Sequence, residues 1–349
     1  MLRIGIVGTG RISAKHIGEL QKLDNAVITA ICDIDEEKLK NVGDSLNIPK
    51  EYRFVNYMDL IKCPEVDAVE ICTPNYLHVP MALEVVKAGK HVEIEKPLTT
   101  FFKSDAEELL KSIEDKKIAN MMCFSYRFMP AVRYAKHLLE NNMLGKIVNV
   151  NVEYLQSGVF IKGRRLEWRF VKEFSGTGTL CDLGSHLIDM TRFLVGDFVS
   201  VCGMSNIVVK ERKKLDSEEY ANVDTDDLTS FIARLENDVL ANFLVTKCAI
   251  GEGNTIKYEI YGTDGVIKFN LNNPDEITLC VGEVDKETGG THTVTVPAEY
   301  RLSQEDAFVR SALGEETPYY PRAEEGAKCQ KILDAVAKSA AENKIVYLK

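Results

Sequence analysis

The stretch 175–190, SGTGTLCDLGSHLIDM, contains three side chains that can do chemistry, namely Asp182, His186 and Asp189. Asp182 and His186 are four residues apart, so on a helix they share one face. Histidine titrates near neutral pH and can take a proton from a hydroxyl group, while a nearby carboxylate can orient the ring or hold a neighbouring hydroxyl. The pattern favours proton transfer, and it leaves Asp189 for a structural hydrogen bond or the surface.

Other interpretations of this stretch stay open. The three polar residues could bind a metal ion, but no third strong ligand at fixed spacing and no cysteine or HExxH-like context accompanies them, so no metal is expected. The glycines of SGTGT could cradle a phosphate at a helix start. The leucines indicate a packed helix, which explains the apolar residues but not a histidine and an acid on one face.

A second glycine-rich stretch, Gly8–Ser13, follows the apolar run LRIGIV and precedes a helix-like stretch. This order is typical of the GxGxxG/A fingerprint of dinucleotide-binding folds. Gly8 would permit the tight turn, and Gly10 would let the backbone approach a pyrophosphate at the helix N-terminus. Ser13 is a mild departure at the third position, where a small residue is needed for close packing.

The acid that ends the second strand indicates which dinucleotide is bound. Asp33 lies about 20 residues beyond the glycines, where a carboxylate can accept both ribose hydroxyls and repels a 2′-phosphate. Together with Asp35 it favours NAD over NADP. Arg11 instead favours NADP, because its guanidinium could pair with a phosphate.

Two more loops are expected at the carboxyl ends of strands, where such sheets bind ligands. They are CTPNYLH (72–78) and EIEKPL (93–98). Proline keeps Lys96 out of the helical region and allows a cis bond, which could aim its side chain into the cleft. As a cation, Lys96 could stabilise a developing alkoxide; a surface lysine at a strand end is the ordinary alternative.

The alternation of predicted strands and helices indicates which sheet positions these loops. Apolar strands alternate with helices in the first 122 residues, which predicts βαβ units and a parallel, doubly wound sheet. The expected strands are 2–7, 26–33, 66–73, 91–97 and 118–124, and the expected helices are 35–46, capped by Asp35, 76–89, ended by Gly89, and 104–117, opened by a Ser/Asp cap.

The pattern changes after about residue 122. Polar and apolar residues alternate in 147–156, which predicts a sheet with one covered face, and Gly262–Gly265 is a hairpin signal. Further strands are expected within 199–210, 226–235, 239–248, 255–262, 266–271, 276–282 and 291–296, with helices at about 130–142 and in the tail. The predicted fold is α/β: a Rossmann dinucleotide-binding domain (1–122) and an α+β domain (123–349) with a large, mainly antiparallel open sheet.

Composition excludes several classes of partner. The 349-residue chain has a formal net charge of −10, which argues against general binding to nucleic acid or anionic membrane. Its nine cysteines are odd in number and form no C-x-x-C pair, as expected for free thiols in a reducing cytoplasm. No secretory signal and no apolar run of about 20 residues is seen, so we expect a cytoplasmic protein.

Taken together and in order, several motifs resemble the glucose–fructose oxidoreductase / inositol dehydrogenase / rhizopine-catabolism (Gfo/Idh/MocA) family. They are GIVGTGRISAKH, ICDID, TPNYLH, Glu95-Lys96-Pro97 and SGTGTLCDLGSHLIDMTRFLVG. The resemblance implies a Rossmann domain and a C-terminal domain whose open sheet forms subunit contacts. It also implies reversible hydride transfer between a nicotinamide cofactor and a secondary alcohol, usually of a sugar or cyclitol.

The resemblance also assigns site residues. The family's catalytic lysine maps onto Lys96, its substrate-positioning acid onto Asp182 and its proton-transfer histidine onto His186. Some members of the family have tyrosine at the position of that histidine. The histidine here points away from that subgroup. The expected dinucleotide contacts are Gly8, Thr9, Gly10, Arg11, Ile12, Asp33, Thr73, Pro74, Asn75, His78, Glu95 and Lys96, and the expected substrate or nicotinamide contacts also include Arg127, Trp168 and Arg169.

The sequence thus predicts an NAD-dependent dehydrogenase acting on a sugar, glycoside or cyclitol, as a homodimer or homotetramer. It does not name the substrate, the carbon oxidised, the direction, or which of Lys96 and His186 first takes the proton. Segment 157–170 is expected to border the pocket, with Arg164 and Arg165 as surface charges by default. The alternatives are another enzyme on this scaffold (dihydrodiol dehydrogenase-like, biliverdin reductase-like or a redox-neutral glycosidase) and a non-catalytic NAD sensor.

Overall fold

The structure, a computed structural model, describes residues 1–348 and divides into two compact units. Unit 1 comprises residues 1–124 and 303–328, and unit 2 comprises residues 125–302 and those from 329 onward. The sequence pattern placed all of 123–349 in one domain, whereas the contacts group 303–328 with unit 1. In that segment helix α10 (Gln304–Ala312) buries Phe308 and Val309 and packs against helix α1 (Ser13–Leu20). The expected domain boundary itself stays a prediction.

Unit 1 contains a six-stranded sheet in the order β3-β2-β1-β4-β5-β6. Every pair of neighbours in it is parallel, so the predicted doubly wound Rossmann sheet is confirmed. The two-residue strand β3 and helix α3 were not expected, because such short elements carry little periodicity. The strands are β1 (Leu2–Val7), β2 (Ala26–Cys32), β3 (Arg53–Phe54), β4 (Ala68–Ile71), β5 (His91–Ile94) and β6 (Asn120–Met122).

The helices of unit 1 connect these strands. The Asp35 side chain accepts a hydrogen bond from the Lys38 amide and so caps α2, as predicted. The predicted Ser/Asp cap of α5 is wrong, because Lys103 occupies the N-cap position and Ser104 is already helical. The other elements are α2 (Glu36–Ser45), α3 (Tyr57–Lys62), α4 (His78–Lys87), α5 (Ser104–Lys116), the start of α11 (Ala323–Glu342), and the 3₁₀ turns η1 (Lys50–Tyr52) and η2 (Asn75–Leu77).

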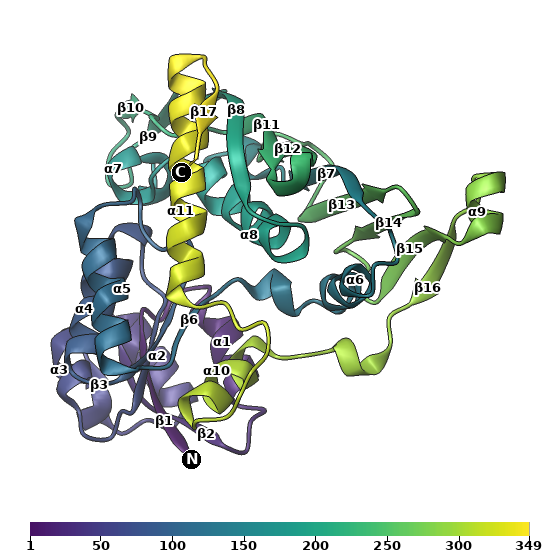
Figure 1. Cartoon of the computed structure of the whole chain (residues 1–349). Helices are drawn as coiled ribbons and strands as arrows, with labels where there is room; N and C mark the ends of the chain where they lie inside the picture. Colours follow the sequence, from purple (N-terminus) through teal and green to yellow (C-terminus); the bar gives the residue numbers. More distant parts are fainter. Residues whose placement is uncertain (349) are drawn as a thin grey trace. The chain divides into compact units, whose positions relative to one another are not determined.

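Unit 2 contains a nine-stranded sheet in the order β16-β15-β14-β13-β7-β12-β11-β8-β17 (Figure 1). It is antiparallel except where β7 pairs with β12, which confirms the predicted architecture. The predicted hairpin at Gly262–Gly265 joins β13 to β14. The strands are β7 (Ile147–Leu155), β8 (Phe198–Asn206), β11 (Leu228–Leu235), β12 (Leu240–Thr246), β13 (Thr255–Gly262), β14 (Gly265–Asn270), β15 (Glu276–Val281), β16 (His292–Thr295) and β17 (Val346–Tyr347), with β9 (Glu211–Lys213) and β10 (Tyr220–Asn222) as a separate ribbon.

Helices lie along one face of this large sheet. Helix α8 (Ser185–Leu194) contacts β7 and helix α6 (Pro130–Glu140) contacts β15 (Figure 1). Strand residues facing the helices are buried, whereas Ile232 and Leu240 are 58% and 51% exposed. The remaining elements of unit 2 are α7 (Lys172–Ser175), α9 (Glu283–Thr288), the π-helical turn η6 (Leu180–Gly184), and the 3₁₀ turns η3 (Ser125–Phe128), η4 (Gly158–Phe160), η5 (Trp168–Phe170), η7 (Glu236–Asp238) and η8 (Ala298–Tyr300).

Two expectations from composition can be compared with residues 1–348. Within that range, no helix has the length and the apolar character needed to cross a bilayer. All nine cysteines are free thiols, as the odd number and the spacing predicted.

Candidate active site

The glycine-rich loop after β1 has the geometry that the fingerprint requires. Gly8 has a φ of +92°, and a Cβ there would lie 2.6 Å from the Cys72 carbonyl oxygen, so only glycine fits. Gly10 is exposed, and a Cβ there would meet no atom within 4 Å. The Ser13 hydroxyl donates to the Gly10 carbonyl at 2.7 Å, which accommodates serine at the third position.

Asp33 lies at the end of β2 and is held by this loop. Its Oδ2 accepts hydrogen bonds from the Thr9 amide at 2.7 Å and the Thr9 hydroxyl at 2.8 Å, and its Oδ1 accepts from the Asp35 amide at 2.9 Å. The carboxylate is therefore oriented before any ligand binds and keeps further lone pairs for hydroxyl groups. A glycine turn, an exposed helix start and an oriented acid fit a dinucleotide.

The two loops that follow β4 and β5 are tied together by His78. Its buried ring lies 2.7 Å from the Pro97 carbonyl oxygen and 2.9 Å from the Thr73 carbonyl oxygen. A neutral ring can donate to only one of them at a time. Burial lowers the pKa of His78, against the effect of the two carbonyls. His78 therefore positions both loops from within, whether or not it touches a dinucleotide.

Lys96 is half-buried and precedes Pro97 through a cis peptide bond. Its amide donates to Glu95 Oε2 at 3.0 Å, and Glu95 Oε1 lies 3.0 Å from His16 Nε2. Burial alone would raise the pKa of Glu95, but the hydrogen bond with His16 and nearby positive charges lower it below its usual value. The backbone that carries Lys96 is thus anchored through a buried carboxylate.

In unit 2, His186 is buried in the first turn of α8 and packs against two tyrosines. Its ring lies edge-on to Tyr126 with centroids 4.6 Å apart, and 6.3 Å from the ring of Tyr154. The two tyrosine hydroxyls are 2.8 Å apart, and Tyr154 also donates to Asn254 Oδ1 at 2.8 Å. The imidazole thus packs against two aromatic rings, whose hydroxyl groups form a hydrogen-bonded series that ends at Asn254.

Asp182 lies in the π-helical turn that precedes α8 and has a cationic partner. Lys247 Nζ, at the end of β12, donates to Asp182 Oδ2 at 2.6 Å. The lysine side chain is 11% exposed and the aspartate side chain 30% exposed. A π-helical turn is rare and often marks a functional site. The carboxylate is therefore fixed in position while part of it stays open to solvent.

The glycine-rich lead-in is packed on the protein itself. Gly178 has a φ of +85°, and a Cβ there would lie 2.8 Å from the Asp226 carbonyl oxygen. The Asp226 carboxylate accepts from the Leu180 amide at 2.9 Å and so holds the start of the π-helical turn. Gly178 is therefore required by the close approach of the protein's own backbone.

Asp189 and Arg127 form a buried ion pair. Arg127 Nε and Nη2 donate to the two Asp189 carboxylate oxygens at 2.7 and 2.6 Å. The guanidinium also lies 5.0 Å from the centre of the Phe193 ring. The structural role expected for Asp189 is therefore found in the core rather than at the surface. Contact of Arg127 with substrate stays a prediction.

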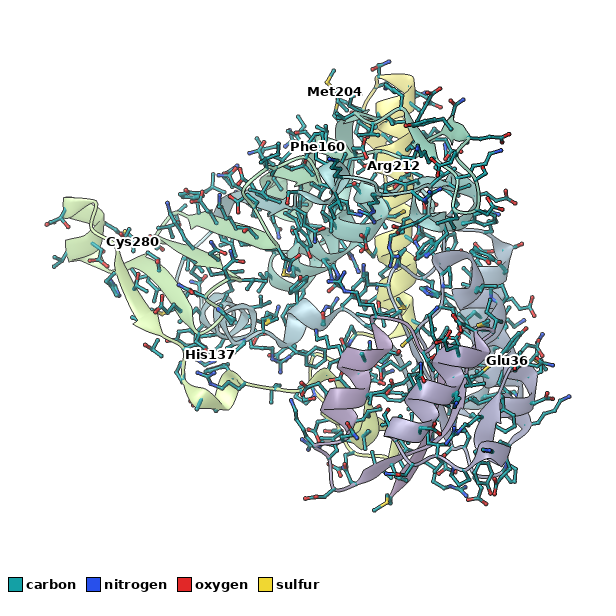
Figure 2. All side chains as sticks on the ribbon, turned by 180° about the vertical axis from the view of Figure 1, so that it is seen from behind. Glu36, His137, Phe160, Met204, Arg212 and Cys280 are labelled. Carbon is teal, nitrogen blue, oxygen red and sulfur yellow. The ribbon has the colours of Figure 1, made fainter. Side chains whose placement is uncertain are left out.

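The segment 157–170 is anchored by Arg212, which lies near Phe160 in Figure 2. Arg212 Nη2 donates to the Val159 carbonyl at 2.8 Å, and its guanidinium lies 4.2 Å from the centre of the Phe170 ring. Arg164 pairs with Glu167, Arg165 pairs with Glu218, and the exposed Arg169 stacks 4.3 Å from the centre of the Trp168 ring. Arg164 and Arg165 were expected to be surface charges; their side chains are 19% and 37% exposed, and each pairs with a glutamate.

Two family descriptions match the chain in succession. Residues 2–124 match "Oxidoreductase family, NAD-binding Rossmann fold", and residues 132–268 match "GFO/IDH/MocA C-terminal domain". An uncharacterized oxidoreductase from Synechocystis is 31% identical over 273 residues, which cover 78% of this chain and 72% of that protein. The chain belongs to the Gfo/Idh/MocA family. It is therefore an NAD(P)-dependent oxidoreductase.

Two further comparisons concern one activity within the Gfo/Idh/MocA family. Levoglucosan dehydrogenase from Pseudarthrobacter phenanthrenivorans is 33% identical over 256 residues, which cover 70% of this chain and 65% of that protein, just under two thirds of its length. A structure of levoglucosan dehydrogenase in complex with NADH superimposes with a TM-score of 0.90 at 28% identity, over 100% of this chain and 99% of the other.

The sequence motifs of this Gfo/Idh/MocA chain did not indicate four residues that shape its candidate site. Lys247, Tyr126 and Tyr154 surround Asp182 and His186, and Asp226 holds the π-helical turn. Only Tyr126 had a local signal, because it directly precedes Arg127. Tyr154 lies on β7, Lys247 follows β12 and Asp226 precedes β11, so their positions follow from sheet register rather than from spacing.

Proposed function

We propose that the chain is an NAD-dependent dehydrogenase that oxidises a secondary alcohol of a sugar, glycoside or cyclitol. One observation carries the proposal: a π-helical turn and the next helix start present Asp182, held by Lys247, together with His186 set against two tyrosines. These groups accompany an NAD-binding Rossmann unit in the same chain. The similarity to levoglucosan dehydrogenase supports a sugar-like substrate.

The acid at the end of β2 supports NAD as the cofactor. Asp33 is oriented by Thr9 and can accept hydrogen bonds from ribose hydroxyls, while its charge opposes a 2′-phosphate. The loop Gly8–Ser13 would hold the pyrophosphate, with Thr73–Asn75, His78 and Glu95 in or beneath the loops that contact the dinucleotide. When bound, the nicotinamide supplies the hydride acceptor.

The residues of the chain would manage the proton and the charge. Oxidation breaks the C–H bond as a hydride leaves and breaks the O–H bond as a proton leaves. Lys96 and His186 share these tasks: the ammonium stabilises the developing alkoxide, and the imidazole accepts the proton. Asp182 accepts a hydrogen bond from a neighbouring substrate hydroxyl, with Lys247 holding the carboxylate. Trp168, Arg169 and Arg127 remain candidates for contacts with the substrate.

A screen of NADH formation tests this function. Aldoses, inositols, uronic acids, glycosides and nucleotide sugars are offered with NAD, and absorbance by NADH is followed. Net NADH formation with a polyol supports the proposal. Glycoside cleavage without net NADH identifies a redox-neutral glycosidase, oxidation restricted to dihydrodiols identifies that branch, and NAD binding without turnover on any candidate identifies a sensor.

We further propose a homodimer or homotetramer in the cytoplasm. The face of the large sheet that carries Ile232 and Leu240 is exposed and partly apolar, as expected of a surface that pairs with a second copy. Nine free thiols suit a reducing compartment.

A further inference from the structure

Four glutamates and one histidine gather inside unit 1. Glu70 lies on β4, Glu93 on β5, Glu95 just after β5, Glu305 on α10 and His16 on α1, and all five are buried. Glu70 and Glu93 face each other in the register of β4 and β5, so their side chains leave the same face of the sheet. Buried carboxylates need protons or a cation, because a charge without a partner is costly in the interior.

The imidazole of His16 lies between these carboxylates in a specific way. Its Nε2 lies 3.0 Å from Glu95 Oε1, whereas its Nδ1 lies 3.6 Å from both Glu70 Oε2 and Glu305 Oε1. A distance of 3.6 Å is too long for a direct N–H···O hydrogen bond. A histidine that donates one ring N–H to a carboxylate and turns the other nitrogen toward further oxygen ligands has the arrangement found at metal centres.

Several polar atoms of the cluster have no hydrogen-bond partner among residues 1–348. They are His16 Nδ1, both carboxylate oxygens of Glu70, Glu93 Oε2 and Gln304 Oε1. The side chains of Glu70 and His16 are 1% and 3% exposed. In contrast, Glu93 Oε1 accepts a hydrogen bond from Gln304 Nε2 at 2.9 Å. The donors in this cluster, Gln304 Nε2, the Cys123 thiol and the His16 ring, are fewer than its buried acceptors, and this imbalance points to a bound cation.

We propose that this cluster binds one divalent first-row transition-metal ion through His16 Nδ1, Glu70 and Cys72, whose donor atoms all lie within 4.8 Å of one another. Glu305, 3.6 Å from His16 Nδ1, would shift to become the fourth ligand, and Glu95 would orient the histidine. Imidazole and carboxylate ligands lie about 2.0–2.2 Å from Zn²⁺, so two ligand atoms of a tetrahedral site are about 3.4 Å apart. The 3.6 Å separations lie close to that value. The Cys72 Sγ belongs to the same close group as His16 and Glu70, and a thiolate ligand suits zinc.

The metal ion would be structural rather than catalytic. It would tie α1, which follows the glycine-rich loop, to β4 and to α10, which enters unit 1 from the later part of the chain. Glu95, on the other side of His16, directly precedes Lys96. The inference does not rest on the proposed dehydrogenase activity, because it concerns the stability of unit 1.

Zinc content of the purified full chain tests the inference. The protein is treated with a chelator, loaded with Zn²⁺, desalted and measured by inductively coupled plasma mass spectrometry, and its thermal midpoint is recorded with and without zinc. We expect the wild-type protein to hold one more Zn²⁺ per chain than the variant Glu70→Gln. We also expect zinc to raise the thermal midpoint of the wild-type protein. Glu95→Gln should weaken zinc binding about 10–100-fold without removing the site.

Matched variants separate the site from adventitious binding by partly exposed thiols and exposed histidines. His292→Gln removes an exposed histidine that lies 3.2 Å from Asp285, and it should leave the zinc content unchanged. If Glu70→Gln does not fold, Glu305→Gln replaces it. Equal zinc content and equal midpoints in wild type and these glutamine variants would overturn the proposal. In that case the carboxyls of Glu70 and Glu93 share a proton instead, and Glu70→Gln should be at least as stable as wild type without metal.

Discussion

Lys247 Nζ lies 2.6 Å from Asp182 Oδ2, although the two residues are 65 positions apart in the chain. This ion pair fixes the carboxylate that we propose holds a substrate hydroxyl. It also makes a lysine on the large sheet a positioning residue for the π-helical turn before His186.

Replacement of Lys247 by methionine should weaken substrate binding. Methionine keeps much of the side-chain length but removes the ammonium group that donates to Asp182 Oδ2. We expect the KM for the sugar to rise about 10–100-fold, as for the loss of a hydrogen bond to a charged group, with little change in NAD affinity. Lys257→Met is the control, because Lys257 is exposed and makes only long contacts of 3.7 and 3.9 Å. An unchanged KM in Lys247→Met would contradict the role.

His186→Ala and Lys96→Ala should each lower kcat by about 10²–10⁴-fold, because general acid–base groups contribute this much. NAD affinity, measured by titration of protein fluorescence, should stay nearly unchanged. Tyr126→Phe is the control for His186, since it keeps the ring against the imidazole and loses only the hydroxyl. Full turnover by either alanine variant would remove that residue from the mechanism.

Asp33→Asn should reduce the preference for NAD. The amide keeps the size of the side chain but loses the charge that repels a 2′-phosphate and that strengthens hydrogen bonds to ribose. The Kd of NAD should rise about tenfold or more, while that of NADP should rise less or fall. Asp115→Asn, which removes an exposed charge on α5 away from the glycine-rich loop, should leave the ratio unchanged. Tighter binding of NADP than NAD by the wild-type chain would refute the cofactor assignment.

The carboxyl of Asp226 should make unit 2 less stable as pH rises. Burial raises the pKa of Asp226 to about 7, although hydrogen bonds from Leu180 and Thr229 and the charge of Lys247 oppose this. The unfolded chain therefore loses its proton near pH 4 while the folded chain keeps it. Between about pH 4 and 7 the free energy of unfolding should fall by at most about 1.4 kcal/mol per pH unit from this group.

Asp226→Asn tests this pH dependence. The variant keeps a side-chain oxygen for the Leu180 amide but cannot ionise, so its denaturation profile should be flatter over that window and more stable than wild type at pH 8. The exposed Asp224, whose carboxylate accepts from the Lys172 amide, provides the control variant Asp224→Asn. Parallel pH profiles for wild type and Asp226→Asn would show that the group is ionised in the folded chain throughout.

Ile232→Asp should disrupt the proposed oligomer. The substitution places a charge in the middle of the exposed sheet face, where a second copy would have to desolvate it. Light scattering after gel filtration should show a shift toward monomer, while the circular dichroism spectrum stays the same. Val55→Asp, at an exposed apolar residue of unit 1, is the control. A wild-type chain that is already monomeric would rule out this role for the sheet face.

Local features of this protein were determined by the sequence itself. Gly8 is required by a positive φ, Asp35 caps the helix that follows it, and alternating strands and helices predict a parallel sheet. Each depends on backbone preferences or on residues a few positions apart. The glycine-rich loop and Asp33 could therefore be paired from spacing alone, because successive parallel strands end at the same edge of a sheet.

Tertiary structure decided which partners the chemical groups meet. Asp182 meets Lys247, Asp189 meets Arg127, and both Glu70 and Glu305 meet His16 only because strand register and helix packing bring distant segments together. The sequence offered one unused signal, since Glu70 and Glu93 interrupt otherwise apolar strands. A pattern can mark a charge inside the core, but what neutralises it depends on groups that only the folded chain assembles.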